Sequence, residues 1–416
     1  MTRIPSPSGC PRVIFVNRFF WPDISATSQV LTDVAFALAA NNVPVEIVAS
    51  RLAYGNPCVR YSANEYRHGV RIHRVATTGF GRAGLWGRAI DYLSFYVSAL
   101  VKAALVLRKG DVLVVKTDPP LLSVPMRLVA WARGARQINW LQDVYPEIAG
   151  LLGFSGFGGT FGRLLAHVRD RSLNASAANV VIGEGMRARL RARGIADSRL
   201  TVIENFTDDE AITPLSTTEN TLRAEWNYRA DTLVVGYSGN LGQAHDLNTM
   251  LSAAMLLHQR GRSDIRFLFV GGGAFFADVQ SFADTHGLTN IDSRPYQPRE
   301  RLSESLTAPD IHWISLRPEV EGYLLPSKFY GVLAAGRPTI FIGSPDGEIA
   351  RILKVNRCGW CFAVGDSAGI ADWLCALAAD RAAVEQAGVA ARRLMDSRYK
   401  RRQIIGKWER LLDELR

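Results

Sequence analysis

The chain has 416 residues, of which 48% are apolar and 21% are charged. These proportions are those of an ordinary globular protein and exclude a disordered or fibrous one. At roughly 100–200 residues per domain, this length predicts two domains. The formal net charge of +10 favours anionic partners such as phosphates, nucleic acid or an acidic membrane surface. Five cysteines, an odd number, argue against a disulfide framework and fit a reducing compartment.

Two segments bear on membrane topology. Met1–Pro11 has no apolar core, so we expect no signal peptide there. The most hydrophobic long window is Ala89–Leu107, and Asp91 and Lys102 interrupt it, so we do not expect it to span a bilayer. Two interpretations of this window stay open. It is either a helix that lies on a bilayer surface or a helix that is buried or half-buried in the core.

Short apolar runs rich in β-branched residues alternate with helix-like segments along the whole chain. The predicted strands of the first half are Val13–Val16, Val45–Ala49, Val70–Val75, Asp111–Val115, Gln137–Leu141, Val180–Ile182 and Leu200–Ile203. Those of the second half are Leu233–Tyr237, Ile265–Val270, Ile311–Ile314 and Pro338–Ile342. Helices are predicted at Ser28–Ala39, Asn248–His258, Phe275–His286, Ser327–Ala335 and Glu348–Leu353. This alternation is typical of βαβ units, in which helices cover both faces of a parallel sheet.

One polar segment interrupts this alternation of strands and helices, and a second one ends it. Asn205–Arg229 carries turn formers with little periodicity and is predicted to be a linker. Tyr399–Arg416 is predicted to be a charged amphipathic helix whose apolar side must pack on another part of the protein. The sequence thus predicts an α/β protein of two doubly wound parallel-sheet domains. Ligands of such domains bind outside the carboxyl ends of the strands, and a cleft between the domains is the natural site.

In the first domain, two loops that follow predicted strands carry candidate residues. After the first strand, Thr27 or Ser28 can cap the next helix, whose positive end either holds a phosphate or is simply capped. In a later loop, Asp143 and Glu147 can orient a hydroxyl group or take its proton. The alternative for these two acids is a helix cap or a salt bridge within the loop. The turn at Asp118-Pro119-Pro120 is expected to be structural, because two prolines force an extended backbone.

In the second domain, glycines and polar side chains follow the first strand. Gly239 and Gly242 let backbone amides approach an anion closely, and Asn240 and His245 add side-chain donors. The next strand ends in the triplet Gly271–Gly273, which is either part of the same site or only a tight turn.

The stretch from Val320 to Pro338 combines an acid, a Pro-Ser-Lys turn and a short helix that ends at a glycine. A proline in the first turn predicts a helix whose free amides, those of Ser327, Lys328 and Phe329, face a diphosphate. Lys328 adds a full charge there, and the alternative is a solvated lysine at a helix start. No histidine spacing typical of a metal site, no GxSxG elbow and no basic surface with interleaved aromatics is visible. Metal, serine-hydrolase and nucleic-acid functions are therefore disfavoured.

Several stretches together resemble a known family. They are WPDISATSQVLTDVAFALA, TDPP, DVYPE, VIENFTD, YSGNLG, FVGGG and EGYLLPSKFYGVLAAGRPTIFIG, and they span almost the whole chain. In order and spacing they resemble the GT-B glycosyltransferases of family 4, especially the fucosaminyl- and colanic-acid-type transferases of bacterial O-antigen and exopolysaccharide synthesis. The resemblance implies two Rossmann-like domains with a nucleotide-sugar in the cleft, and a C-terminal helix that crosses back onto the first domain. It also implies transfer with retention at the anomeric carbon, without a metal ion or other cofactor.

The resemblance carries over to some positions and not to others. The family's usual motif has two glutamates separated by seven residues, and Glu321 matches the first, which contacts the donor sugar in the family. The second falls on Phe329, which cannot bind ribose hydroxyls, and this chain carries the variant Pro326–Lys328 instead. In the family a lysine often follows the glycine loop to meet the diphosphate, and His245 stands near that place.

The resulting hypothesis assigns residues to the donor, the acceptor and catalysis. The expected donor-binding residues are Gly239, Asn240, Gly242, His245, Gly272, Tyr296, Glu321, Ser327 and Lys328. The expected acceptor-binding residues are Asp23, Thr27, Asp143 and Glu147. The expected catalytic residues are Glu321, Lys328 and Asp143. Because the departing phosphate can itself take the acceptor proton in a retaining reaction, Asp143 is either a base or a positioning residue.

The resemblance implies a hexosyltransferase-type enzyme that moves a sugar from a nucleotide-diphosphate sugar, with UDP the expected nucleotide. The expected acceptor is a hydroxyl of a lipid-linked saccharide in cell-surface polysaccharide synthesis, reached from the inner face of the cytoplasmic membrane, which has an anionic surface. The expected acceptor domain is 1–206, with helix 399–416 packed back on it, and the expected donor domain is 207–398. Two alternatives are a nucleotide-sugar 2-epimerase of the same fold and a non-catalytic scaffold whose site has decayed, as Phe329 suggests.

Overall fold

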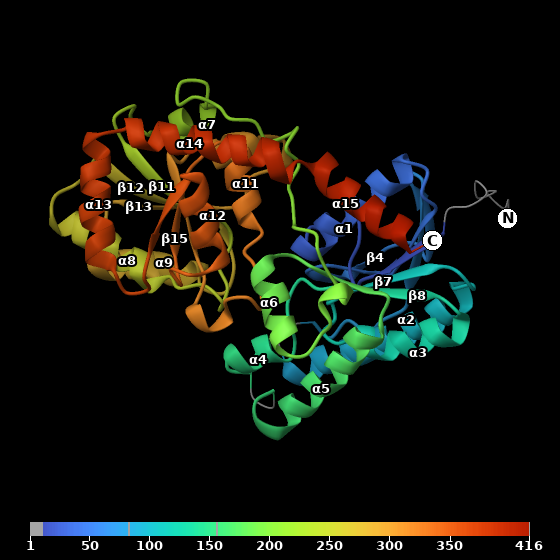
Figure 1. Ribbon diagram of the computed structural model, residues 1–416. Coiled ribbons are helices and arrows are strands. Elements are labelled where there is room, and N and C mark those ends of the chain that lie inside the picture. The colour runs from blue at the N-terminus through green and yellow to red at the C-terminus, as the bar shows by residue number, and fades with distance from the viewer. Residues whose placement is uncertain (1–10, 82–83, 155–156, 416) are drawn as a thin grey trace. The chain divides into compact units, whose positions relative to one another are not determined.

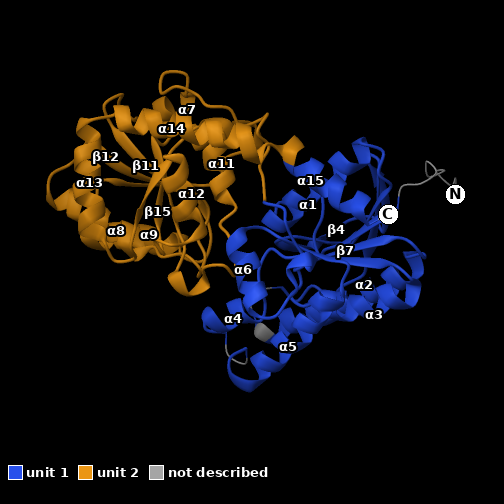
Figure 2. Ribbon diagram, in the orientation of Figure 1, with its two compact units in different colours: residues 1–204, 404–416 blue, residues 205–403 orange. Residues whose placement is uncertain are grey.

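The structure is a computed structural model that describes residues 11–81, 84–154 and 157–415 (Figure 1). It divides into two compact units, shown in Figure 2. Unit 1 comprises residues 1–204 and 404–416, and unit 2 comprises residues 205–403. The expectation that Met1–Pro11 holds no signal peptide falls almost entirely outside the described residues.

The described part of unit 1 is built on a sheet with the strand order β10-β9-β8-β7-β1-β2-β6-β5. Neighbouring strands pair in parallel, except that β5 and β6 are antiparallel. The strands are β1 (Val13–Val16), β2 (Val45–Ser50), β5 (Asn64–Arg67), β6 (Val70–Val75), β7 (Val112–Lys116), β8 (Arg136–Trp140), β9 (Ala178–Val181) and β10 (Leu200–Val202), and a hairpin is formed by β3 (Leu52–Ala53) and β4 (Asn56–Arg60). The strand order reverses between β1 and β7, where ligands bind in open sheets of this kind.

All strands predicted in the first half are present, and their ends shift by at most two residues. The sequence reasoning missed β3, β4 and β5. Every residue of β4 is exposed, and β5 carries polar side chains that are mostly exposed. These strands lack the apolar run or the alternation on which a strand prediction depends.

Helices cover both faces of this sheet (Figure 1). They are α1 (Ala26–Ala40), α2 (Leu85–Val106), α3 (Ser123–Arg133), α4 (Glu147–Leu151), α5 (Gly159–Ala175), α6 (Glu184–Ala192) and α15 (Arg401–Glu414). On one face, Phe95 and Ala99 of α2 and Met126 of α3 pack in a buried cluster with Val16 and Val115. The window Ala89–Leu107 is thus half-buried, because one side of α2 belongs to the core of unit 1.

The opposite face of the sheet receives the C-terminal helix α15. Side chains alternate between the two faces along a strand, so Phe15 lies on the face opposite to Val16. Trp408 of α15 is fully buried, and its ring centroid lies 6.2 Å from that of Phe15 and 4.6 Å from that of Trp140. Lys407 also forms an ion pair with Glu204. Residues from the two ends of the chain therefore share one core.

Unit 2 has, in its described residues, a wholly parallel sheet in the order β13-β12-β11-β14-β15-β16. The strands are β11 (Leu233–Asn240), β12 (Ile265–Gly272), β13 (Ile291–Arg294), β14 (Ile311–Ser315), β15 (Thr339–Ile342) and β16 (Gly359–Phe362). The helices are α7 (Thr221–Glu225), α8 (Asn248–Gln259), α9 (Phe276–His286), α10 (Leu302–Thr307), α11 (Lys328–Ala334), α12 (Glu348–Asn356), α13 (Ser367–Ala379) and α14 (Ala382–Leu394). The strand order reverses between β11 and β14.

Strands β11 and β12 run further than the sequence predicted, to Asn240 and Gly272. Gly239 pairs with Gly271 at these ends, so the ladder continues through residues without side chains, where hydrophobic periodicity gives no signal. The edge strands β13 and β16 were missed. Their residues are all only partly buried, and neither forms the longer apolar run that marks a central strand.

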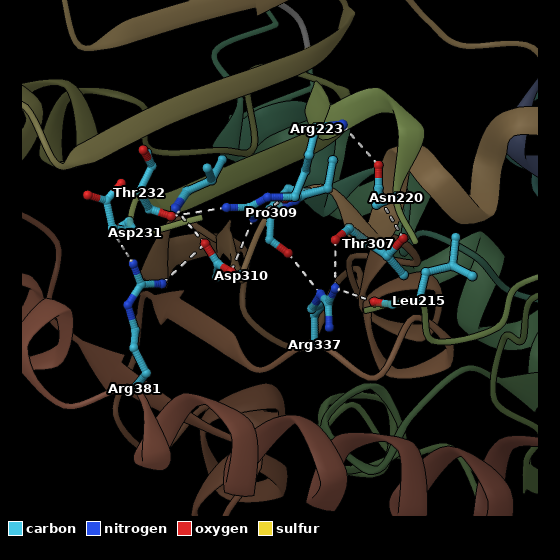
Figure 3. A network of polar contacts seen from close by, with 12 residues as sticks. Leu215, Asn220, Arg223, Asp231, Thr232, Thr307, Pro309, Asp310, Arg337 and Arg381 are labelled. Atoms are coloured by element: carbon cyan, nitrogen blue, oxygen red, sulfur yellow. Dashed lines mark hydrogen bonds and ion pairs between the residues drawn. The ribbon is translucent and has the colours of Figure 1, made fainter. Parts of the chain in front are cut away.

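The prediction of a linker at Asn205–Arg229 is wrong for its second half, which contributes to the core of unit 2. Asn220 accepts a hydrogen bond from the Arg223 amide (3.1 Å) and so caps α7. The buried Arg223 guanidinium donates to Ala308 O (2.7 Å) and to Asp310 (3.1 Å). Figure 3 shows Asn220, Arg223 and Asp310 within one network of polar contacts. Arg337 adds hydrogen bonds to the carbonyls of Leu215, Thr307 and Pro309. A polar composition here indicates a buried polar network rather than a free connection.

Candidate functional site

The carboxyl end of β11 forms the centre of the candidate site in unit 2. This end lies at the point where the strand order reverses, between β11 and β14. Gly239 has φ +125°, which favours glycine, and a Cβ atom there would lie 3.7 Å from Cε of Lys328. The backbone of β11 and the side chain of Lys328 therefore meet where a ligand of this fold is expected.

Lys328 directs its ammonium group to the end of β11. Its Nζ donates to the hydroxyl of Tyr237 and to Asn240 O (3.3 Å), and lies 3.9 Å from the centroid of the Tyr237 ring. Burial lowers the pKa of Lys328 to about 7. Within the described residues, no carboxylate forms an ion pair with Lys328. This cation therefore contacts neutral groups only, and an incoming anion would supply its missing counter-charge.

His245 presents a neutral ring to this ammonium group. Its Nδ1 donates to Ser315 O at 2.6 Å, because a carbonyl oxygen can only accept. Its Nε2 then carries a lone pair and lies 3.4 Å from Nζ of Lys328. Burial, together with the charge of Lys328, lowers the pKa of His245 to about 3. The ring therefore accepts a hydrogen bond from Lys328 and adds no charge of its own at neutral pH.

The glycine triplet after β12 lies beside the same loop. Gly273 has φ +121°, and a Cβ atom there would lie 2.6 Å from Oδ1 of Asn240, so only glycine fits. The ring of Tyr296 lies against Gly272, where a Cβ atom would be 3.2 Å from the ring. The predicted residues Asn240, Gly272 and Tyr296 are thus brought to the carboxyl ends of β11, β12 and β13. The triplet is more than a turn, because it packs against the loop of Gly239 and Asn240.

The start of α11 differs from the expectation. The helix begins at Lys328 with Ser327 as its N-cap, and Pro326 precedes the cap instead of lying in the first turn. The amide of Phe329 donates to Pro326 O (3.2 Å). The expectation that three free amides face a phosphate is therefore wrong for Phe329, whose amide is engaged in the turn. Gly336, with φ +63°, ends the helix as predicted.

Phe329 belongs to the core of unit 2. Its side chain is 1% exposed and packs edge-to-face on Tyr330. An aromatic residue at this position is explained by packing and does not indicate a decayed site.

Glu321 holds the beginning of α12. Its Oε1 accepts a hydrogen bond from the amide of Glu348 (2.8 Å), the first residue of that helix. A Cβ atom at Gly347 would lie 2.8 Å from the other carboxylate oxygen, Oε2. The carboxylate thus stands at the positive end of a helix, where a negative charge is stabilised. Sequence reasoning missed this structural task, because the two residues are far apart in the chain.

We expect Glu321→Ala to lower the free energy of unfolding by about 1 kcal/mol, because α12 loses the acceptor for its first amide. Urea denaturation followed by circular dichroism measures this change. Glu319→Ala is the matched control, since Glu319 lies two residues away and its side chain is 55% exposed. Equal stability of the two variants would contradict the capping role.

A second polar cluster lies at the strand reversal of unit 1, after β1, β7 and β8. The Lys116 side chain, 1% exposed, donates to Thr27 O (3.0 Å) and lies 3.7 Å from the Trp140 ring centroid. The Thr27 hydroxyl donates weakly to Asp118 (3.5 Å). Asp143 follows β8 and interacts electrostatically with Asp118 and Lys116.

Asp143 and Lys116 in this cluster both have shifted pKa values. Burial and the charge of Asp118 raise the pKa of Asp143 to about 6, and Lys116 opposes the rise. Burial lowers the pKa of Lys116 to about 7. An acid and a base that titrate near neutrality at the ligand-binding edge of a sheet are typical of a site that exchanges protons. Lys116 and Asp118 were missed, although a lysine that ends the apolar run of β7 was a usable signal.

Two of the four predicted acceptor residues lie elsewhere. Asp23 is buried and accepts hydrogen bonds from the Tyr54 amide (2.7 Å) and the Tyr61 hydroxyl (3.1 Å), which attach its loop to the β3–β4 hairpin. Glu147 forms an ion pair with Arg169 at 2.5 Å, the loop salt bridge that was its alternative. Only Thr27 and Asp143 come together.

The expected cap of α1 also needs correction. The helix starts at Ala26, and its N-cap is Ser25, whose side chain accepts from the amide of Ser28 (3.3 Å). Neither Thr27 nor Ser28 is the cap. The hydroxyl of Thr27 is instead directed to Asp118, in the polar cluster of unit 1.

Comparison with known proteins agrees with this architecture. Residues 25–205 match the family model described as glycosyl transferase 4-like domain. The protein named glycosyltransferase WbjE of Pseudomonas aeruginosa is 26% identical over 275 residues, which cover 65% of this chain and 67% of that protein. The protein named colanic acid biosynthesis glycosyl transferase WcaI of Escherichia coli (strain K12) is 26% identical over 274 residues, 64% of this chain and 66% of its own. The alignments therefore span about two thirds of each relative.

Solved structures show the same fold at low sequence identity. The crystal structure of Anabaena HepE in complex with UDP superposes with a TM-score of 0.72 at 12% identity, covering 97% of this chain and 100% of that one. WaaG, a glycosyltransferase involved in lipopolysaccharide biosynthesis, superposes with a TM-score of 0.69 at 13% identity, covering 97% and 99%. Residues 25–205 thus resemble the glycosyl transferase 4-like domain, the whole chain has the GT-B fold of these solved structures, and it is similar to glycosyltransferases of bacterial surface-polysaccharide synthesis.

Proposed function

We propose that this glycosyltransferase moves a sugar from a UDP-sugar to a hydroxyl of a lipid-linked saccharide, with retention at the anomeric carbon. The observation that carries the proposal is Lys328. Its half-buried ammonium group has no carboxylate partner among the described residues and lies at the strand reversal of unit 2. Such a cation suits the diphosphate of a nucleotide-sugar.

The donor half of the proposal rests on charge. When the glycosidic bond to phosphate breaks, the nucleoside diphosphate leaves with growing negative charge, and a fixed cation in a partly desolvated site stabilises it. Lys328 supplies that charge once the diphosphate is bound, because a neighbouring anion raises the pKa that burial lowers to about 7. The neutral His245 holds the ammonium group in place. Gly239 and Gly242 carry no side chain that would keep a phosphate from the backbone amides, and the exposed ring of Tyr296 is a surface on which the base can stack. UDP is favoured because HepE, with the same fold, was crystallised with UDP.

The acceptor half rests on the polar cluster of unit 1. In the reaction the acceptor oxygen bonds to the anomeric carbon, the bond from that carbon to the phosphate oxygen breaks, and the acceptor proton is released. Asp143, with a pKa raised to about 6, is ionised at neutral pH and can take this proton or orient the hydroxyl while the departing phosphate takes it. Lys116 and Asp118 position it. The family resemblance supports retention and the absence of a metal requirement.

The biological setting is proposed from the relatives. The name of WcaI assigns it to colanic acid biosynthesis, and repeat units of such polymers are built on lipid carriers. A lipid-linked acceptor requires that the enzyme works at the membrane, and a net charge of +10 favours its anionic cytoplasmic surface. We therefore propose a peripheral location on the inner face of the cytoplasmic membrane, with unit 1 as the acceptor unit and unit 2 as the donor unit.

We expect UDP to stabilise the protein more than ADP or GDP does. At a concentration of about 100 times its Kd, a nucleotide that binds only the native state adds about 2.7 kcal/mol, which is a rise of about 5 °C in the unfolding midpoint. Differential scanning fluorimetry with the three nucleotides, followed by a panel of UDP-sugars, measures this.

The same panel separates the alternatives. A scaffold without a site would show no rise with any nucleoside diphosphate, and this result would contradict the proposal. An epimerase would convert the stabilising UDP-sugar in the absence of an acceptor, which the proposed transferase does not do. Product analysis by mass spectrometry and NMR distinguishes the two activities.

A further inference from the structure

Helix α2 of unit 1 is apolar on the side that does not face the sheet. Its inner side is buried through Phe95, Ala99 and Ala103. Its outer side carries exposed large apolar residues at intervals of three or four, which lie on one stripe of a helix: Trp86, Ile90, Leu93, Val97, Val101 and Leu105. By length and composition Trp86–Val106 is apolar enough to cross a membrane. Only 22% of the most apolar window of this helix is buried in the protein.

Two neighbouring helices continue this apolar surface. Helix α3 packs against both α2 and α5, and Figure 1 shows the three helices in one layer along unit 1. Leu128 and Trp131 of α3 are 69% and 74% exposed, and Phe161 and Leu164 of α5 are both 58% exposed. We call the outer stripe of α2 together with these four residues the outer face. An exposed apolar surface of this extent marks an interaction site.

The charges around the outer face are of one sign. The only acids of these three helices are Asp91 and Asp170, and both are buried. Exposed bases occur on or beside the helices: Arg108, Lys109, Arg133, Arg163 and Arg171. A groove of about 380 Å³ beside α2 is lined by Val97, Val101, Leu105 and Lys102, among others. Apolar side chains bordered by cations are complementary to a bilayer that contains anionic lipids.

We propose that the outer face of α2, α3 and α5 lies on the membrane and inserts its apolar side chains among anionic lipids. Because the inner side of α2 belongs to the core of unit 1, α2 lies along the bilayer and does not cross it. Trp86 and Trp131 are amphipathic side chains suited to the headgroup level. A second copy of the chain is a poorer occupant, since a two-fold interface would bring these bases together without exposed acids to pair them.

The inference deepens the membrane location proposed above, but its test needs no sugar transfer. The purified full chain is mixed with vesicles of phosphatidylglycerol and phosphatidylcholine, and the bound fraction is measured by sedimentation. We expect the wild type to bind and Leu93→Ser/Leu105→Ser to bind at least about tenfold more weakly, because two apolar anchors are lost. Brominated lipids should quench the fluorescence of the wild type more than that of Trp86→Phe/Trp131→Phe.

The matched control is Val355→Ser/Val389→Ser, which alters two exposed valines of unit 2 (80% and 60% exposed). It should bind vesicles as the wild type does. Stabilisation by UDP should be unchanged in both double serine variants, which shows that they fold. Absence of vesicle binding by the wild type, equal binding of Leu93→Ser/Leu105→Ser, or a dimer in light scattering that this variant disrupts would overturn the proposal. If UDP still stabilises the protein, the proposed transfer would stand.

Discussion

Lys328→Met is expected to lower kcat for sugar transfer by about 100-fold or more, the loss typical when one preorganised charge at a developing anion is removed. Methionine keeps the apolar stem that lies against the Tyr237 ring, so the change removes the charge and little of the packing. The fold should not suffer, because the lowered pKa of Lys328 means that burying its charged form opposes folding. Steady-state kinetics with a UDP-sugar and thermal unfolding of the same sample measure both effects.

The control for this variant is Lys354→Met, which changes an exposed lysine in the last turn of α12 in the same unit. It should keep wild-type kcat and wild-type stabilisation by UDP. Lys328→Met should also lose most of its stabilisation by UDP, because the diphosphate loses its cation. A Lys328→Met protein that folds and turns over within about twofold of the wild type, where 100-fold is expected, would remove Lys328 from the site.

The second large effect is expected for Asp143→Asn, which should lower kcat by about 100-fold or more if the carboxylate takes the acceptor proton. With a pKa of about 6, wild-type activity should fall as the pH drops below 6, since the carboxylate becomes protonated. Asp143→Asn should lose this acidic limb of the pH profile. Rates measured from pH 5 to pH 8 with saturating donor test this.

The effect of the substitution on stability provides the control, because it should be opposite in direction to the effect on activity. The folded-state pKa of Asp143 lies above its unfolded value of 3.8, so its ionisation opposes folding increasingly as the pH rises from about 4 to about 6. Asp143→Asn should therefore be at least as stable as the wild type at pH 7. If it unfolds more readily and its remaining activity keeps the acidic limb, Asp143 is a structural residue and not a base.

The fold could be predicted from the sequence because its central strands are buried on both faces and are therefore apolar along their whole length. Val13–Val16 is of this kind, and so are the first four residues of β7, which ends in Lys116. The edge strands β5, β13 and β16 are partly or wholly exposed. They form by backbone pairing with a neighbouring strand, and their amino-acid composition does not mark them as strands. The linker prediction for Asn205–Arg229 was partly wrong for a related reason. Polar residues also form buried hydrogen-bond networks such as that of Arg223.

Candidate site residues could be proposed from the sequence where glycines and polar side chains directly follow one strand, as for Gly239 and Asn240. It was not predictable where a residue's partner comes from a distant segment. Glu321 was expected to contact the donor sugar, and the structure shows that it accepts a hydrogen bond at the start of α12. Asp23 and Glu147 are acids that follow strands of unit 1, as Asp143 does, yet Tyr54 and Arg169 engage them. Only the three-dimensional environment separates the three acids.

The burial of Trp408 between Phe15 and Trp140 has a consequence for biosynthesis. Chains emerge from the ribosome with the N-terminus first and fold domain by domain. Unit 2 is continuous in sequence, so all of it is synthesised before residues 404–416, the part of the final helix that belongs to unit 1. Unit 1 has to wait for the last residues to be translated, and until then its β1 and β8 lack their tryptophan partner. The unit that is synthesised first therefore completes its core last, and a nascent chain stalled before α15 leaves an aromatic surface open to chaperones.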